Sequence, residues 1–85
     1  MYLMGDYFVE CITDHIPDAG WTASARISRK EDWRKLAEIP KVVFATLVEC
    51  PTRRDAEYAA IQWAREHVSM RSDTIEKALE DGHAL

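Results

Sequence analysis

Two adjacent arginines at a predicted helix start are the most suggestive chemical feature of the sequence. Residues 50–68 read CPTRRDAEYAAIQWAREHV, in which Thr52 and Asp55 have the spacing of a helix-capping pair. The free N–H groups and the dipole of a helix start favour negative charge. Arg53 and Arg54 are therefore candidate contacts for an anion or a nucleic acid.

Two further cations, Arg26 and Lys30, belong to the same candidate anion or nucleic-acid contact, because they lie in the most basic stretch of the chain. Residues 21–41 carry six basic and three acidic residues, a net charge of +3. The alternative interpretation is a capped helix with solvated arginines. Asp55 and Glu57 already supply negative charge to the helix start, which favours this alternative.

No spacing of catalytic or metal-ligating residues is recognisable. The three histidines stand apart, and Cys11 and His15 share a strand face without any C-x-x-C or H-x₃-H pattern. The sequence contains no phosphate-binding loop and no glycine-rich nucleotide fingerprint. An 85-residue domain also leaves little room for a water-excluding pocket. We therefore predict no catalytic residues, no metal, no cofactor and no small-molecule substrate, and hence no enzyme.

Hydropathy patterns predict three strands followed by a helix. Residues 7–13 and 21–29 alternate as a hairpin with a loop of about five residues, and residues 42–49 form an apolar, β-branched strand. The helix at 52–68 gathers small residues on one face, which suits close packing on a sheet. The predicted fold is α+β, a three-stranded antiparallel sheet in β-β-β-α order packed on one C-terminal helix.

Weaker helical patterns flank this unit. Short extra helices are predicted at 31–38, where a tryptophan anchors a charged connection, and at 73–81. Residues 1–68 are expected to form a single domain, with residues 69–85 as a C-terminal tail that is either a short helix or partly disordered.

A three-stranded sheet with one helix leaves one of its faces uncovered. Four large apolar or aromatic side chains are candidates for a protein interface on this basis: Phe8, Ile12, Phe44 and Trp33. The partner is another protein or a second copy of the chain, giving a homodimer. An exposed strand edge offers a further route, by strand addition.

Composition and charge bear on the kind of partner and on the cellular compartment. The chain has a net charge of −4, and its first twenty residues carry four acidic and no basic residues. A polyanion is repelled by such a chain unless the cations gather on one face. Two cysteines on apolar segments suggest reduced thiols, and no signal peptide or membrane-spanning run is evident. We expect a cytoplasmic protein that does not enter a membrane.

Residues 7–68 resemble the C-terminal β-β-β-α part of double-stranded-RNA-binding domains. The resemblance depends on a pattern at the helix start of a hydroxyl residue, two cations and later alanines, namely Thr52, Arg53, Arg54, Asp55, Ala56, Ala59 and Ala60. It implies that Arg53 and Arg54 meet phosphates across a groove. The strand order is also similar to that of HicB-type antitoxins and other small bacterial and phage regulators.

Together these patterns favour a small non-enzymatic binding or regulatory protein that acts through protein contacts. A nucleic-acid-binding domain of the double-stranded-RNA type is the alternative.

Overall fold

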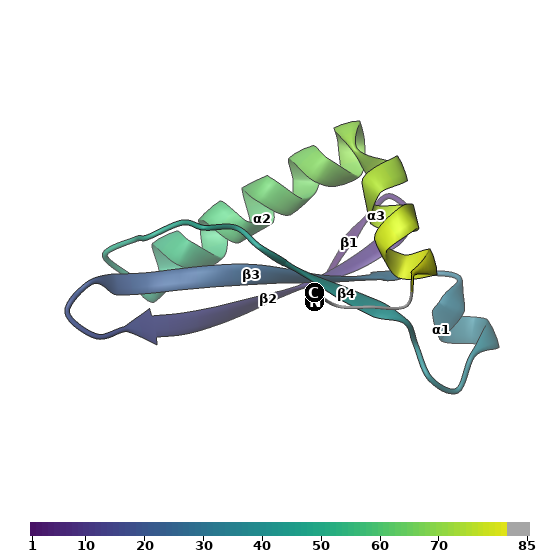
Figure 1. The fold of residues 1–85 in the computed structure, drawn as a ribbon, viewed down its shortest axis with the longest axis horizontal. Coiled ribbons are helices and arrows are strands. Elements are labelled where there is room, and N and C mark those ends of the chain that lie inside the picture. The colour runs from purple at the N-terminus through teal and green to yellow at the C-terminus, as the bar shows by residue number, and fades with distance from the viewer. Residues whose placement is uncertain (82–85) are drawn as a thin grey trace.

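A four-stranded antiparallel sheet forms the centre of the computed structural model, which describes residues 1–81 (Figure 1). The strands follow one another in chain order and in space: β1 (Tyr2–Met4), β2 (Tyr7–Ile16), β3 (Gly20–Arg29) and β4 (Lys41–Ala45). Three helices complete the fold: α1 (Asp32–Lys35), α2 (Arg53–Met70) and α3 (Ser72–Glu80). The predicted α+β class and antiparallel sheet are confirmed, but the sheet has four strands instead of three.

The extra strand is β1, which lies in a segment that was expected to precede the sheet. It is only three residues long and pairs with Tyr7, Phe8 and Val9 of β2 through a tight turn. Gly5 has a φ of +57° in that turn, a conformation that glycine adopts without steric cost. A strand this short carries too few residues to show a hydropathy period, so the sequence pattern missed it.

The β2–β3 hairpin is longer than predicted, with only residues 17–19 outside the ladder. The Ala19 amide donates to the Ile16 carbonyl across 3.0 Å, and Asp18 has a φ of +63°. Pro17 with a positive φ at the next residue is typical of a type II turn. This turn lets the strands pair up to Ile16 and Gly20, where the sequence suggested a loop of about five residues.

The third predicted strand, at 42–49, ends early at Ala45 as β4. Thr46 still bonds to the Ala23 carbonyl, but the chain next pairs with β3 through a bridge between Trp21 and Cys50. A regular continuation of the β3–β4 register would place residue 48 opposite Trp21, so two residues are looped out. Leu47 lies in this bulge with a φ of +60° and 89% of its surface exposed.

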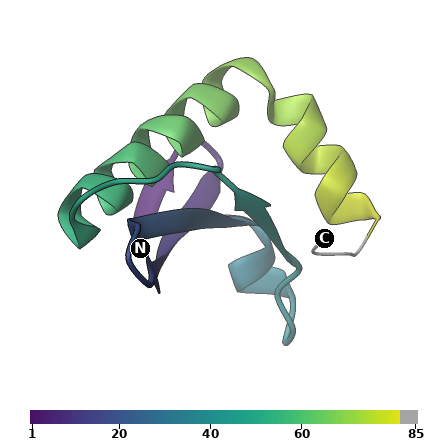
Figure 2. The same cartoon turned by 60° about the vertical axis from the view of Figure 1, so that its left-hand side comes forward.

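Helix α2 packs its alanine face on the sheet. Ala56, Ala60 and Ala64 are each 0% exposed, and their small side chains let the helix backbone approach β2 and β3 closely. The Thr52 hydroxyl accepts a hydrogen bond from the Asp55 amide at 3.1 Å, which confirms the predicted N-cap. Figure 2 shows α2 and α3 arching over the same side of the sheet.

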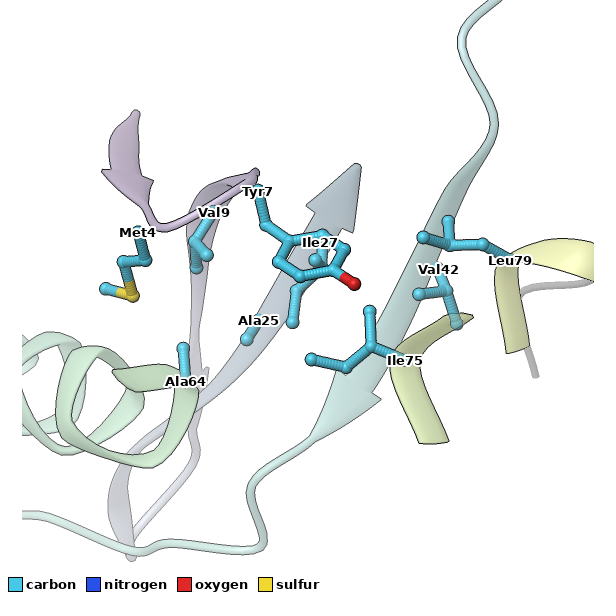
Figure 3. Packing of buried hydrophobic residues seen from close by; sticks show 9 residues of the cluster. All are labelled: Met4, Tyr7, Val9, Ala25, Ile27, Val42, Ala64, Ile75 and Leu79. Carbon is cyan, nitrogen blue, oxygen red and sulfur yellow. The ribbon is translucent and has the colours of Figure 1, made fainter. Parts of the chain in front are cut away.

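Helix α3 covers the part of the sheet that α2 leaves open. Ile75 and Leu79 are buried against Ile27 and Val42, as the packing in Figure 3 shows. The predicted helix at 73–81 is thus found at Ser72–Glu80, and that at 31–38 is reduced to α1. Residues 82–85 of the predicted tail lie outside the described residues. The core therefore lies between one face of the sheet and two helices.

Candidate functional site

The sheet face opposite α2 and α3 is not covered by a helix layer. The strand register places side chains from all four strands on it, including Leu3, Phe8, Glu10, Ile12, Asp14, Ser24, Arg26, Ser28, Lys41 and Val43. We call these ten residues the open face. It mixes apolar side chains with small polar and charged ones.

Trp33 of α1 packs against one end of the open face. Its indole N–H donates to the Ser28 hydroxyl at 3.0 Å, and its ring meets that of Phe8 edge-on with centroids 5.9 Å apart. The Lys41 ammonium lies 5.2 Å from the Trp33 ring centroid. The Trp33 indole is thus held in place by its N–H bond while 40% of the residue stays exposed.

A charged cluster occupies the middle of the open face. Arg26 donates to Glu10 at 2.6 Å, and the Lys41 ammonium lies 3.7 Å from the other oxygen of that carboxylate. The hydrogen bond from Arg26 outweighs the effect of burial and holds the pKa of Glu10 below its ordinary value. The Nε of Arg26 is buried and makes no hydrogen bond within residues 1–81. One carboxylate, Glu10, is thus shared between two cations, Arg26 and Lys41, and the cluster carries a net charge of +1.

The outer edge of β2 adds free backbone groups to this surface. The Lys30 amide donates to the Asp6 carbonyl, which shows that the even-numbered residues of β2 direct their backbone N–H and C=O groups towards β3. Antiparallel ladders alternate with a period of two, so the odd-numbered residues of β2 point their backbone groups away from β3. β1 pairs with those at 7 and 9 only. Three odd-numbered residues beyond it have no strand partner in the described chain: Cys11, Thr13 and His15.

A polar hollow of ≈ 560 Å³ lies at the opposite end of β2 from the hairpin turn. It is lined by side chains from the β1–β2 turn, the end of β3, α1 and α3, namely Asp6, Tyr7, Arg29, Lys30, Glu31, Arg34, Lys35 and Glu76. Four cations face three carboxylates, so the hollow has little net charge. Arg29 has two acidic partners, because Glu76 lies 2.8 Å and Asp32 3.5 Å from its guanidinium.

A buried phenol completes this network. The Tyr7 hydroxyl donates to the second oxygen of Glu76, so that Tyr7 and Arg29 hold α3 against the sheet. Burial and the bond to Glu76 raise the pKa of Tyr7 well above its ordinary value of 10.0. Burial would raise the pKa of Glu76, but the hydrogen bonds from Tyr7 and Arg29 prevail and lower it from 4.5. The network is a structural clasp that joins β2, β3 and α3 through Tyr7, Arg29 and Glu76.

Glu76→Gln is expected to weaken the domain in a pH-dependent manner. Because the folded-state pKa of Glu76 is depressed, its charge stabilises the fold above the unfolded pKa, and this contribution is lost as the pH falls through the folded value. The difference in urea midpoint between wild type and variant should shrink from pH 7 to about pH 3. Glu80→Gln, at an exposed position of the same helix, should show no such trend. A difference independent of pH would contradict the clasp.

The four predicted anion contacts do not share one surface. Arg53 and Arg54 are exposed at the start of α2, beside the hairpin end of the sheet, whereas Lys30 follows the opposite end of β3. Arg26 lies on the open face in its pair with Glu10. A single duplex groove would have to meet cations distributed along a molecule 42 Å long and interrupted by acidic side chains.

Three of the four predicted interface residues come together. Phe8 and Ile12 lie on the same, open face of β2, four residues apart, and Trp33 packs on Phe8. Phe44 lies on the other face, where it packs on Trp63 with ring centroids 5.5 Å apart, and Trp63 in turn stacks on His67. The period-two pattern of β4 was visible in the sequence, but only the register with β3 shows which of its faces meets the helices.

Metal ligands, a disulfide and a membrane-spanning helix were also sought among the described residues. No group of three His, Cys, Asp or Glu side chains suited to a metal ion occurs among residues 1–81, and the half-buried Cys11 and Cys50 are not bonded to each other. Within the same residues, no helix is long and apolar enough to cross a membrane.

Comparison of the whole chain with protein-family models, curated proteins and solved structures gave no match. Function must therefore be inferred from the surface of this protein alone.

Proposed function

We propose that the chain is a non-enzymatic binding domain that recognises another protein with its open face and the adjoining edge of β2. The observation that supports this most directly is the position of Phe8, Ile12 and Trp33 on a sheet face that no helix layer covers. These apolar and aromatic side chains are suited to desolvation on binding.

Competing uses of the same domain have less support. In the hollow beside α1 and α3, Tyr7 and Arg29 already bond to Glu76, so these three groups support the fold and are less suited to catalysis. The exposed pair Arg53 and Arg54 is the remaining support for nucleic-acid binding, and it lies away from the other basic residues.

Ile12→Glu is expected to abolish partner binding without unfolding the domain. Ile12 is only half buried, so the fold tolerates a polar end there, whereas a desolvated interface does not. Proteins captured quantitatively from the native host by wild-type bait should be lost from the Ile12→Glu bait by at least ~10-fold, equivalent to about 1.4 kcal/mol. Tyr58→Glu, on the outer side of α2 and 64% exposed, should retain them.

The capture experiment also tests the alternative. Arg53→Ala/Arg54→Ala bait should retain the same proteins. Loss of bound material from that bait alone, together with salt-sensitive retention of nucleic acid by the wild type, would overturn the proposal in favour of nucleic-acid binding.

A further inference from the structure

We propose that the free edge of β2, residues 10–16, accepts an extended segment of another protein as an added strand, and that this segment is basic. This inference rests on the proposed function and specifies the part of the surface and the chemistry of the partner.

The geometry of the edge suits strand addition. It extends for seven residues from the end of the β1 pairing to the hairpin turn. Three residues on it present an N–H and a C=O outward at a period of two: Cys11, Thr13 and His15. An added strand that pairs with all three gains a complete ladder, and its side chains fall alternately on the open face and the helix face.

The negative charge of Asp14 at this edge favours a basic partner segment. The first twenty residues contain no Lys or Arg, and Asp14 is exposed beside Ile12 on the open face. On the helix face, burial and the nearby Glu57 carboxylate raise the pKa of the Cys11 thiol. Cations are also present: the N-terminal ammonium lies near Cys11, and Glu10 is shared between Arg26 and Lys41. Asp14 makes no ion pair within residues 1–81, so its carboxylate is the one available to a partner at this edge. A segment with an apolar residue opposite Ile12 and Lys or Arg opposite Asp14 complements this pattern, because cross-strand opposite charges attract.

A second copy of the chain does not fit the edge. Symmetric antiparallel pairing that keeps the faces aligned has three central registers. With Ile12 on the two-fold axis, the second copy's His15 falls opposite Val9, where Tyr2 of β1 is already paired. With Asp14 on the axis, the two Asp14 carboxylates oppose each other. With Thr13 on the axis, the second copy's Pro17 falls opposite Val9, where Tyr2 of β1 is already paired. Like charge or steric conflict therefore disfavours each register.

Binding of a designed probe tests the proposal. The end-blocked peptide KTKTVKV places Val opposite Ile12 and Lys opposite Asp14, and ETETVEV is its acidic analogue. Labelled peptide is titrated with full-length protein at low salt and followed by fluorescence anisotropy, and amide chemical shifts locate the site. We expect the basic peptide to bind at least ~10-fold more tightly, with shifts concentrated at residues 10–16.

Two proline variants distinguish this edge from the other. Proline is tolerated where an edge N–H points to solvent, so Thr13→Pro should fold but remove the central donor of the β2 edge. The bond from the Thr46 amide to the Ala23 carbonyl gives the exposed Ala45 the same outward backbone position at the end of β4, which makes Ala45→Pro the matched control. Thr13→Pro should weaken the basic peptide by at least ~10-fold, and Ala45→Pro by less than ~2-fold.

Asp14→Lys provides a second test that does not disturb the backbone, and it should invert the preference between the two peptides. Equal binding of both peptides, equal loss in both proline variants, or a wild-type dimer that Thr13→Pro dissociates would each overturn the proposal. If the Ile12→Glu bait loses its proteins while the wild type ignores both peptides, the partner contacts the open face alone. The proposed function then stands and the edge inference is wrong.

Discussion

Gly20→Ala is expected to lower the free energy of unfolding by ~3 kcal/mol or more, a large share of what a domain of this size has. An ideal Cβ on Gly20 would lie 2.3 Å from the carbonyl oxygen of Cys50 and 3.5 Å from the Cα of Pro51. Gly20 also has a φ of +106°, which side-chain-bearing residues rarely adopt. Both neighbours are backbone atoms, so relief requires the Trp21–Cys50 bridge to separate.

Gly5→Ala is the matched control for that experiment. Its φ of +57° is also positive, but an added Cβ meets only Val68 Cγ1 at 3.6 Å, an ordinary contact. We expect a loss of ~1 kcal/mol from backbone strain alone. Urea unfolding followed by tryptophan fluorescence measures both variants. Equal losses would show that the close approach of Gly20 to Cys50 does not exist in solution.

Ile75→Ala is expected to cost ~2–5 kcal/mol, as truncations of buried aliphatic side chains do. Ile75 is 1% exposed and packs between α3 and the sheet, in the same cluster as Ile27 and Val42. The loss combines the transfer free energy of the side chain with the cavity that remains. α3 also contributes Glu76 to the clasp with Tyr7 and Arg29, so its loosening weakens those bonds as well.

Thr74→Ala, one residue earlier and exposed, is the control and should change the urea midpoint by no more than ~0.5 kcal/mol equivalent. A cost below ~1 kcal/mol for Ile75→Ala would mean that α3 is not part of the cooperative core. The same result would remove the basis for the pH effect expected of Glu76→Gln.

Structural features that depend on one short segment of the chain could be predicted from the sequence. Alternating residues in β2 and β3 gave the hairpin and its two faces, and the Thr52 cap with the alanine spacing gave α2 and its sheet-packing face. These patterns depend only on the periods of strand and helix, so neighbours within a few residues suffice to determine them.

Features that depend on pairing between distant segments were decided by the tertiary structure. In the clasp, Glu76 lies 69 positions from Tyr7 and 47 positions from Arg29 along the chain. No local sequence pattern relates Glu76 to either residue. The sequence pattern placed Phe44 in the same interface as Phe8 and Ile12. The β3–β4 register instead places Phe44 on the helix face of the sheet, where it packs on Trp63.

The sequence by itself thus determined the β2–β3 hairpin, helix α2 and the acidic character of the chain. The tertiary structure decided the extent of β4 and the pairing of β1, that residues 11, 13 and 15 of β2 have no strand partner within residues 1–81, and that the predicted cations are dispersed. The physical reason is that side-chain periodicity is a property of one segment, whereas register, edge and surface are properties of at least two segments in contact.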